Sequence, residues 1–441
     1  MSAGRNVINS IIIGFALLAC FIGAGNLVFT PAIGLIAGRE WQLALFGFAL
    51  PGVLLPVMAF VAVVRAGGTE GVASEMGKTF SILFTTVAVL CTSLLAAAPR
   101  AAATIHELGV TAIFGPVPQI LTTLVFFAAV LCLSLNPSAV VKIIGKYLAP
   151  VLLTIMAAVI VKGAVCPIDI PADTGIPRLF ALRSGFMDGY RTMDAFAGLI
   201  FSGAIFAAIA AFSANQPNSR AQIIMACGAT VVAGLGFLFI CGGLIYLGAA
   251  GSGMFDVNIG DAAILAGLFG AIFKWFGPFA LACAAILASL ATVVGLTAGA
   301  SSFFSRVTKE KLPYKTGVVI ICAASLLASI LGDDATMRYA VQILTLLYPA
   351  AIVLIGFNVI RCCIINRGTF LGGVYAALIV SFLEAFPAVV GPYITSTIRV
   401  LPFFIHGLAW ITPAIICGIL GTIFYYFFGK AKSLNEEAKP T

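Results

Sequence analysis

The chain has 441 residues, of which 61% are hydrophobic and 9% are charged, and its mean hydropathy is +1.14. Soluble domains carry about 25% charged residues, so the composition excludes a soluble globular protein and indicates a chain that crosses a membrane several times. The net charge of +8 is explained by basic cytoplasmic loops and does not predict a nucleic-acid partner.

Hydropathy predicts an all-α integral membrane protein with twelve spans. The spans cover residues 8–36, 41–65, 79–105, 116–136, 138–164, 186–212, 221–250, 263–303, 314–331, 338–362, 369–391 and 400–428. The eighth run exceeds one bilayer crossing, so part of it must tilt or project outside. With the N-terminus inside, most of the 24 Lys and Arg residues lie in cytoplasmic loops, so we expect both termini to be cytoplasmic.

The first span is interrupted at mid-bilayer. Residues 9–38 read NSIIIGFALLACFIGAGNLVFTPAIGLIAG, and each of the two closely spaced glycines costs a helix about 1 kcal/mol relative to alanine. We expect a helix to about Phe21, an unwound turn, and a second helix from about Asn26, whose side chain suits an N-cap. Free N–H groups attract an anion and free carbonyls attract a cation, so this break is a candidate binding site. A plain Gly-rich packing face is the alternative.

The third span places polar side chains at membrane depth. Arg100, Thr104 and Glu107 follow a spacing of i, i+4 and i+7, so they share one helical face. This face either lines a pathway or holds a buried ion pair, in which Arg100 pairs with Glu107 or with Asp194.

The sixth span carries a second candidate break. Residues 186–201 read FMDGYRTMDAFAGLIF, a charged stretch that leads into an apolar run. A carboxylate at membrane depth is costly and usually faces a partner or a cavity, which makes Asp194 a candidate site residue. The alternative is a span that starts near Ala195 and leaves Asp194 in the outer loop, which we otherwise place at residues 167–185.

Breaks in the first and sixth spans indicate an inverted repeat of five plus five spans, with substrate held between the breaks at the midplane. The predicted division is a first repeat at residues 1–166, a second repeat with its preceding outer loop at 167–366, and spans eleven and twelve at 367–429. Residues 430–441 are polar and are expected to form a disordered cytoplasmic tail.

Three stretches carry a resemblance to a known family. GFALLACFIGAGNLVFTPAIG in span one, APRAAATIHELG in span three and GYRTMDAFAGLIFSGAI in span six resemble signature stretches of the bacterial branched-chain amino acid:cation symporters. Hydropathy and span count agree over essentially the whole chain. The resemblance implies sodium- or proton-driven uptake of leucine, isoleucine and valine at the bacterial inner membrane. It also implies the LeuT-type inverted-repeat fold of the sodium-coupled amino acid transporter superfamily.

The resemblance also implies a sodium site beside the first break, because the superfamily holds its ion with two carbonyls of the broken helix and with groups of span eight. Carried over by position, the ligands are Ala19, Ile22, Ala288 and Thr292. Ala291 stands where one superfamily hydroxyl would be, and Ser289 is expected to compensate. This departure keeps a proton-coupled alternative open, with His106, Glu107 or Asp194 as the titrating group.

A zwitterionic amino acid should lie between the two breaks. We expect its carboxylate at the N–H groups of the second half-helix and its ammonium at the carbonyls of both breaks, with Asp194 as the charge partner. Its side chain should meet apolar walls. The candidate substrate residues are Cys20, Phe21, Gly23, Ala24, Gly25, Asn26, Ala96, Arg100, Tyr190, Thr192, Met193, Asp194 and Phe196.

The rival classes are a proton-coupled carrier of related neutral amino acids such as methionine, a channel, and an intramembrane enzyme. No span repeats a filter-like motif, and the sequence offers no nucleophile–base pair, so transport is favoured over both of the last two. The expected partners are the amino-acid substrate and membrane lipid, with no nucleic acid and no obligate protein partner.

Overall fold

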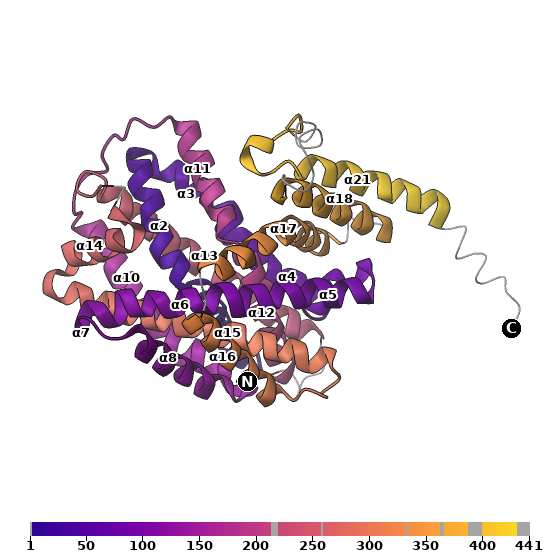
Figure 1. The fold of residues 1–441 in the computed structure, drawn as a ribbon, viewed down its shortest axis with the longest axis horizontal. Helices are drawn as coiled ribbons and strands as arrows, with labels where there is room; N and C mark the ends of the chain where they lie inside the picture. The colour runs from indigo at the N-terminus through magenta and orange to yellow at the C-terminus, as the bar shows by residue number, and fades with distance from the viewer. Residues whose placement is uncertain are drawn as a thin grey trace, which may run out of the picture.

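The regular elements are helices throughout the part of the chain that the computed structural model describes, namely residues 2–212, 219–256, 259–331, 334–361, 366–386 and 399–429 (Figure 1). The α-helices are α1 (Ser2–Phe21), α2 (Ala24–Ala37), α3 (Trp41–Phe48), α4 (Leu55–Ala66), α5 (Lys78–Val89), α6 (Ala98–Thr104), α7 (Ala112–Phe114), α8 (Gln119–Ser134), α9 (Pro137–Ile143), α10 (Ala149–Val165), α11 (Arg178–Arg191), α12 (Asp194–Phe212), α13 (Ser219–Ala250), α14 (Asp261–Phe273), α15 (Gly277–Val307), α16 (Tyr314–Leu331), α17 (Asp334–Val359), α18 (Arg367–Ala385) and α21 (Ile411–Phe424).

Several of these helices are joined by turns of wider or tighter winding. The connecting turns are η1 (Gly38–Glu40), η2 (Ala49–Leu54), η3 (Glu70–Met76), η4 (Leu90–Ala97), η5 (Ile105–Thr111), η6 (Ile144–Leu148), η8 (Lys274–Phe276), η9 (Phe404–His406) and η10 (Tyr425–Gly429). Helices α3 and α4, for example, are joined by η2 into one continuous apolar helix. This helix runs from Trp41 to Ala66 and so agrees with the predicted second span, residues 41–65.

Eight helical runs among the described residues are long and apolar enough to cross a membrane, and α11 with α12, bent by 44°, adds a ninth if the pair counts as one span. Three shorter apolar helices, Val7–Phe21, Gln119–Ser134 and Ile411–Phe427, correspond to parts of predicted spans one, four and twelve. The sequence therefore located the helical segments well. The predicted tail, residues 430–441, lies outside the described residues, as do residues 387–391 of the predicted eleventh span.

Two predicted boundaries were wrong, and the long eighth run, whose ends agree with the prediction within four residues, is divided. Helix α11 begins at Arg178, directly after Pro177, so the outer loop ends eight residues earlier than expected. The long eighth run divides into α14 and α15, because Lys274 adopts a positive φ of 53° that no α-helix accommodates. The last span begins as a helix only at Ile411, since Phe403 and Gly407 also have positive φ. Hydropathy sums cannot detect single left-handed residues.

Glycines let pairs of helices approach backbone to backbone. A Cβ on Gly34 of α2 would collide with the carbonyl of Ile245 in α13, and one on Gly248 of α13 would collide with the carbonyl of Pro31 in α2. The same reciprocal arrangement joins α3 and α11, which lie side by side in Figure 1, through Gly47. Close contact of this kind is how membrane helices gain packing energy without a hydrophobic driving force.

Helix α15 packs against both α1 and α12 at the centre of the molecule. A Cβ on Gly295 would lie 2.7 Å from Sγ of Cys20 and 3.1 Å from the ring of Phe201, so α15 runs close to the end of α1. This packing brings the middle of α15 to the first break. Helices α18 and α21 pack on each other and, through α18, on α17 (Figure 1).

Candidate functional site

The first break lies where it was predicted, but its second helix starts earlier. Helix α1 ends at Phe21, and α2 begins at Ala24 after the N-cap Gly23, which has extended φ and ψ of −71° and 166°. No side chain caps α2, and its first internal backbone bond runs from Leu27 N–H to the Gly23 carbonyl. The N–H groups of Ala24, Gly25 and Asn26 therefore have no acceptor within the helix.

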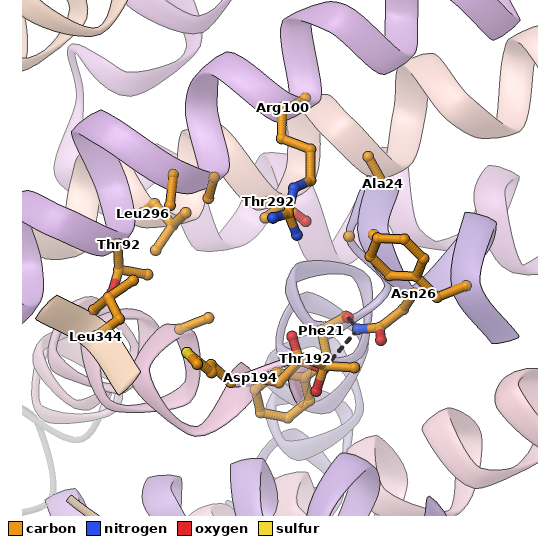
Figure 2. A pocket seen from close by; sticks show the side chains of 18 of the residues that line it. Phe21, Ala24, Asn26, Thr92, Arg100, Thr192, Asp194, Thr292, Leu296 and Leu344 are labelled. Atoms are coloured by element: carbon orange, nitrogen blue, oxygen red, sulfur yellow. Dashed lines mark hydrogen bonds between the residues drawn. The ribbon is translucent and has the colours of Figure 1, made fainter. Parts of the chain in front are cut away.

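Asn26 is the third residue of α2 and does not cap it. Its Nδ2 donates to the Phe21 carbonyl at 2.8 Å and to Oδ2 of Asp194 at 2.9 Å, and the side chain is buried (Figure 2). The prediction that Asn26 is the N-cap of α2 was wrong, because Gly23 occupies the N-cap position with an extended backbone. The amide of Asn26 instead connects the end of α1 to the start of α12, so it joins the two breaks directly.

The second break falls at Thr192 and Met193, between α11 and α12. Met193 has a φ of 53°, a conformation that costs a non-glycine residue roughly 1–3 kcal/mol. Thr192 Oγ1 donates to the Gly189 carbonyl at 2.8 Å, which closes the last turn of α11. Asp194 is the first residue of α12, where the helix dipole favours a negative charge.

A cavity of about 130 Å³ lies between the two breaks. Asp194 supplies its acidic group and the Phe21 carbonyl a neutral acceptor, while Arg100 of α6 lies across the opening from them in Figure 2. Arg100 and Asp194 both line the cavity, and neither belongs to an ion pair within 4 Å among the described residues. The Arg100 guanidinium lies 5.7 Å from the centre of the Phe29 ring. One cavity thus presents both signs of charge.

Most of the predicted substrate residues meet at this cavity. Its lining includes Cys20, Phe21, Gly23, Ala24, Gly25, Asn26, Ala96, Arg100, Thr192, Met193 and Asp194. Tyr190 and Phe196 do not line it. Tyr190 accepts a hydrogen bond from Nε1 of Trp410 at 3.2 Å, and Phe196 is fully buried against Tyr348. Both residues belong to the packing behind the second break.

The structure also adds residues that the sequence did not suggest, mainly Phe29, Thr92, Leu296, Val341 and Leu344. Helical periodicity could have found three of them. Thr92 lies two turns before Arg100 on the same face, Leu296 lies one turn after Thr292, and Phe29 lies one turn after Asn26 or Gly25. Val341 and Leu344 come from α17, which carries no sequence signal linking it to the breaks.

Of the predicted sodium ligands, Ala19 belongs to the last turn of α1, Ile22 follows its end, and Thr292 of α15 contacts this end. Thr292 Oγ1 donates to the Cys20 carbonyl at 3.0 Å, and Thr292 also lines the cavity. Ser289 Oγ, one turn away, is buried and has no hydrogen-bond partner among the described residues. Within the same part of the chain, no backbone bond across the break ends on the carbonyl of Ala19 or Ile22. Ala288 is fully buried in α15.

A second cavity adjoins the candidate site. This neighbouring cavity of about 340 Å³ shares Phe29, Arg100, Arg191 and Thr192 with it and extends along α2 to Ile36. At the end of α15, Nε and Nη2 of Arg306 donate to the two carboxylate oxygens of Glu70 in η3 at 3.0 and 3.1 Å.

Solved structures share this arrangement of helices. The chain is similar to the nucleobase-cation-symport-1 family transporter Mhp1 in a closed conformation, with a TM-score of 0.62 and 13% identity, covering 96% of this chain and 93% of that one. It is also similar to MhsT in complex with L-phenylalanine, with a TM-score of 0.54 and 17% identity, covering 95% and 98% of the two chains. These likenesses show the LeuT-type fold that the sequence predicted.

Sequence relatives match over nearly the whole length. The branched-chain amino acid permease BraB of Bacillus subtilis is 32% identical over 97% of this chain and 98% of its own. The permease BrnQ of Escherichia coli is 31% identical over 94% of each chain. Residues 6–428 match the family described as branched-chain amino acid transport protein. The chain therefore belongs to the branched-chain amino acid transport protein family.

Proposed function

We propose that this protein is a secondary symporter that imports leucine, isoleucine and valine with sodium by alternating access. The observation that carries the proposal is the cavity between the two breaks, which has a cationic part, an acidic part and apolar walls. A free branched-chain amino acid has the same three features. Family membership makes the chain a transport protein, which removes the enzyme alternative.

In the proposed binding mode the substrate carboxylate meets the free N–H groups of Ala24, Gly25 and Asn26 at the positive end of α2. Arg100 adds a charged donor to that end, because its Nη1 lies 3.8 Å from where a Cβ on Gly25 would be. The ammonium group meets Asp194 and the neighbouring Phe21 carbonyl. An aliphatic side chain then faces the apolar part of the lining, which Leu296, Val341 and Leu344 supply.

An apolar wall discriminates only weakly between the affinities of aliphatic amino acids, because one methylene is worth about 1–3 kcal/mol in an apolar pocket. Leucine, isoleucine and valine should therefore compete for the same cavity, and methionine should enter it with lower affinity. A polar side chain would lose more, since the apolar wall offers it no hydrogen-bond partner.

Sodium is the coupling ion that the oxygen atoms near the first break favour. The carbonyls of Ala19 and Ile22 accept no backbone bond across the break, and the buried hydroxyl of Ser289 has no partner among the described residues. These oxygens, with the Ala288 carbonyl and Thr292 Oγ1, would hold the ion and stabilise the unwound end of α1 where lipid cannot. Proton coupling through Asp194 is the second candidate, because this carboxylate lies in the substrate cavity.

Alternating access requires the cavity to open to each side in turn. The Glu70–Arg306 ion pair between η3 and the end of α15 closes the side that we assign to the cytoplasm, while the cavity along α2 leaves the outer side open. We assign twelve spans in a five-plus-five inverted repeat followed by two further helices, with both termini cytoplasmic in the bacterial inner membrane. Single cysteines placed after Gly429 and within residues 167–177 should then react with an impermeant thiol reagent from opposite sides.

The test of function is uptake of radiolabelled leucine into proteoliposomes, with sodium and proton gradients imposed separately. We expect saturable accumulation against the leucine gradient when sodium is higher outside, and little when only a pH gradient is present. Equal uptake without any ion gradient would indicate a facilitator or a channel and would refute the symport proposal.

A further inference from the structure

A second polar cavity lies beside α17, and the residues of α17 that line it are close in sequence to those that line the candidate substrate cavity. It has a volume of about 270 Å³, and Tyr190, Thr345 and Glu384 are among the residues that line it. Leu344, the neighbour of Thr345 in the sequence, lines the substrate cavity instead. Tyr348, also in α17, packs against Tyr190, and the centres of their rings are 5.1 Å apart. The second cavity is therefore close to the second break.

Glu384 is the acidic residue of this cavity, and it lies near the end of the apolar helix α18. Its Oε1 atom is buried and has no hydrogen-bond partner among the described residues, and no ion pair in that part of the chain includes it. The backbone N–H of Ala409 donates a hydrogen bond to the carboxylate. Glu384 is half-buried, and a carboxylate in an apolar helix with no cationic partner among the described residues points to a ligand.

The other polar groups around Glu384 are oxygen atoms with free lone pairs. Pro349 has no N–H, so the carbonyl of Thr345, four residues earlier in α17, lacks its helical donor. Tyr190 Oη already accepts from Trp410, and Ser381 Oγ uses its proton on a carbonyl of its own helix at 2.8 Å. Among the described residues that line the cavity there is no Lys, Arg or His. Its chemistry is that of an acceptor-rich, singly acidic site.

We propose that Glu384 and these oxygens form a site for a small monovalent metal cation such as Na⁺, separate from the proposed coupling site beside Thr292. One carboxylate among neutral oxygens matches a single positive charge, whereas calcium sites in proteins use several carboxylates. A bound ion would hold α18 against Tyr190, two residues before the break at Thr192. The site would thereby stabilise the bend between α11 and α12.

Trp410 provides a direct reporter because its indole contacts Tyr190 at this cavity. The chain has three tryptophans, so a variant with Trp41→Phe and Trp275→Phe keeps Trp410 alone. Purified protein without amino acid would be titrated with NaCl against choline chloride at fixed ionic strength and pH. We expect a saturable change in Trp410 emission, with the half-saturating Na⁺ concentration raised at least about tenfold by Glu384→Gln, because a full charge at contact distance is removed.

Two control variants test whether the Na⁺ response depends on Glu384 itself, rather than on the loss of any carboxylate or on the proposed coupling site. Glu107→Gln neutralises an exposed carboxylate of η5 and should leave the titration unchanged. Thr292→Ala disables the proposed coupling site and should also leave it unchanged. An unaltered Na⁺ response in Glu384→Gln would overturn the inference. A response lost in Thr292→Ala but kept in Glu384→Gln would also overturn it, while supporting the coupling site. Emission that changes with pH but not with Na⁺ would assign the cavity to protonation only.

Discussion

Replacing Gly25 with valine tests the substrate site at the point where the carboxylate is expected. A Cβ at this position would lie 3.6 Å from the Phe29 ring and 3.8 Å from Arg100 Nη1, which is ordinary contact, so the first added carbon needs no backbone shift. The two further methyl groups of valine would extend into the cavity in front of the α2 amides. The variant should therefore fold and fail to bind.

The size of the loss follows from the contacts that become blocked. A hydrogen bond to a charged group contributes about 1.5–3 kcal/mol, so excluding the carboxylate from two amides costs about 3–6 kcal/mol. This corresponds to a rise in the leucine Kd of roughly 10² to 10⁴. Gly25→Ala, with one added carbon, should show a smaller loss.

The assay is equilibrium binding of radiolabelled leucine to purified protein at saturating sodium, alongside thermal unfolding. Gly356→Val is the matched control, because a Cβ there meets nothing within 4 Å. It should bind leucine as the wild type does. If Gly25→Val folds and its leucine Kd stays within about threefold of the wild-type value, which is under 1 kcal/mol, the carboxylate lies elsewhere.

Three further predictions concern the ion, the closed side and the link between the breaks. Thr292→Ala should raise the sodium concentration for half-maximal uptake while leaving leucine affinity at saturating sodium nearly unchanged, and Thr292→Ser should restore the wild-type value; full uptake driven by a pH gradient alone would contradict sodium coupling. Glu70→Gln should open the cytoplasmic side, seen as faster labelling of cysteines introduced there, and the charge swap of Glu70 with Arg306 should slow the labelling again. Asn26→Ala removes two buried hydrogen bonds worth about 0.5–1.5 kcal/mol each, so thermal unfolding should shift downward and leucine binding should weaken; an unchanged melting temperature would show that the amide does not hold the breaks together.

The sequence predicted the two breaks correctly because their chemistry is local. The closely spaced Gly23 and Gly25 in the first span and Asp194 at membrane depth are costly in a continuous helix, so each marks an interruption without any knowledge of packing. In the third span, Ala96 and Arg100 line the cavity, but Thr104 and Glu107, which were expected on the face of Arg100, are not among its described lining residues. Thr104 Oγ1 donates to the Arg100 carbonyl at 3.0 Å, and Glu107 is exposed in the wider turn η5, where the spacing of a regular α-helix no longer holds.

The residues that were missed or misplaced depend on packing between distant segments. Val341 and Leu344 line the cavity only because α17 crosses beside the second break. Phe196 was expected in the cavity from its nearness to Asp194, but α12 turns it towards Tyr348. The bond from Asn26 to Asp194 joins residues 168 positions apart, a contact that no local pattern encodes.

The reciprocal glycine contacts restrict which helices can slide past each other. Helix α2 is locked to α13 by Gly34 and Gly248, and α3 is locked to α11 by Gly47 and Gly185, because a neighbouring carbonyl fills the space of each missing side chain. A shift of one residue along either interface would push a larger side chain into that carbonyl. Helices α2 and α13 should therefore move as one rigid body, and so should α3 and α11. The start of α2, where we propose that the substrate carboxylate binds, should move with α13, and α11, which precedes the second break, should move with α3. Any change in the distance between the two breaks should therefore occur between these two pairs of helices.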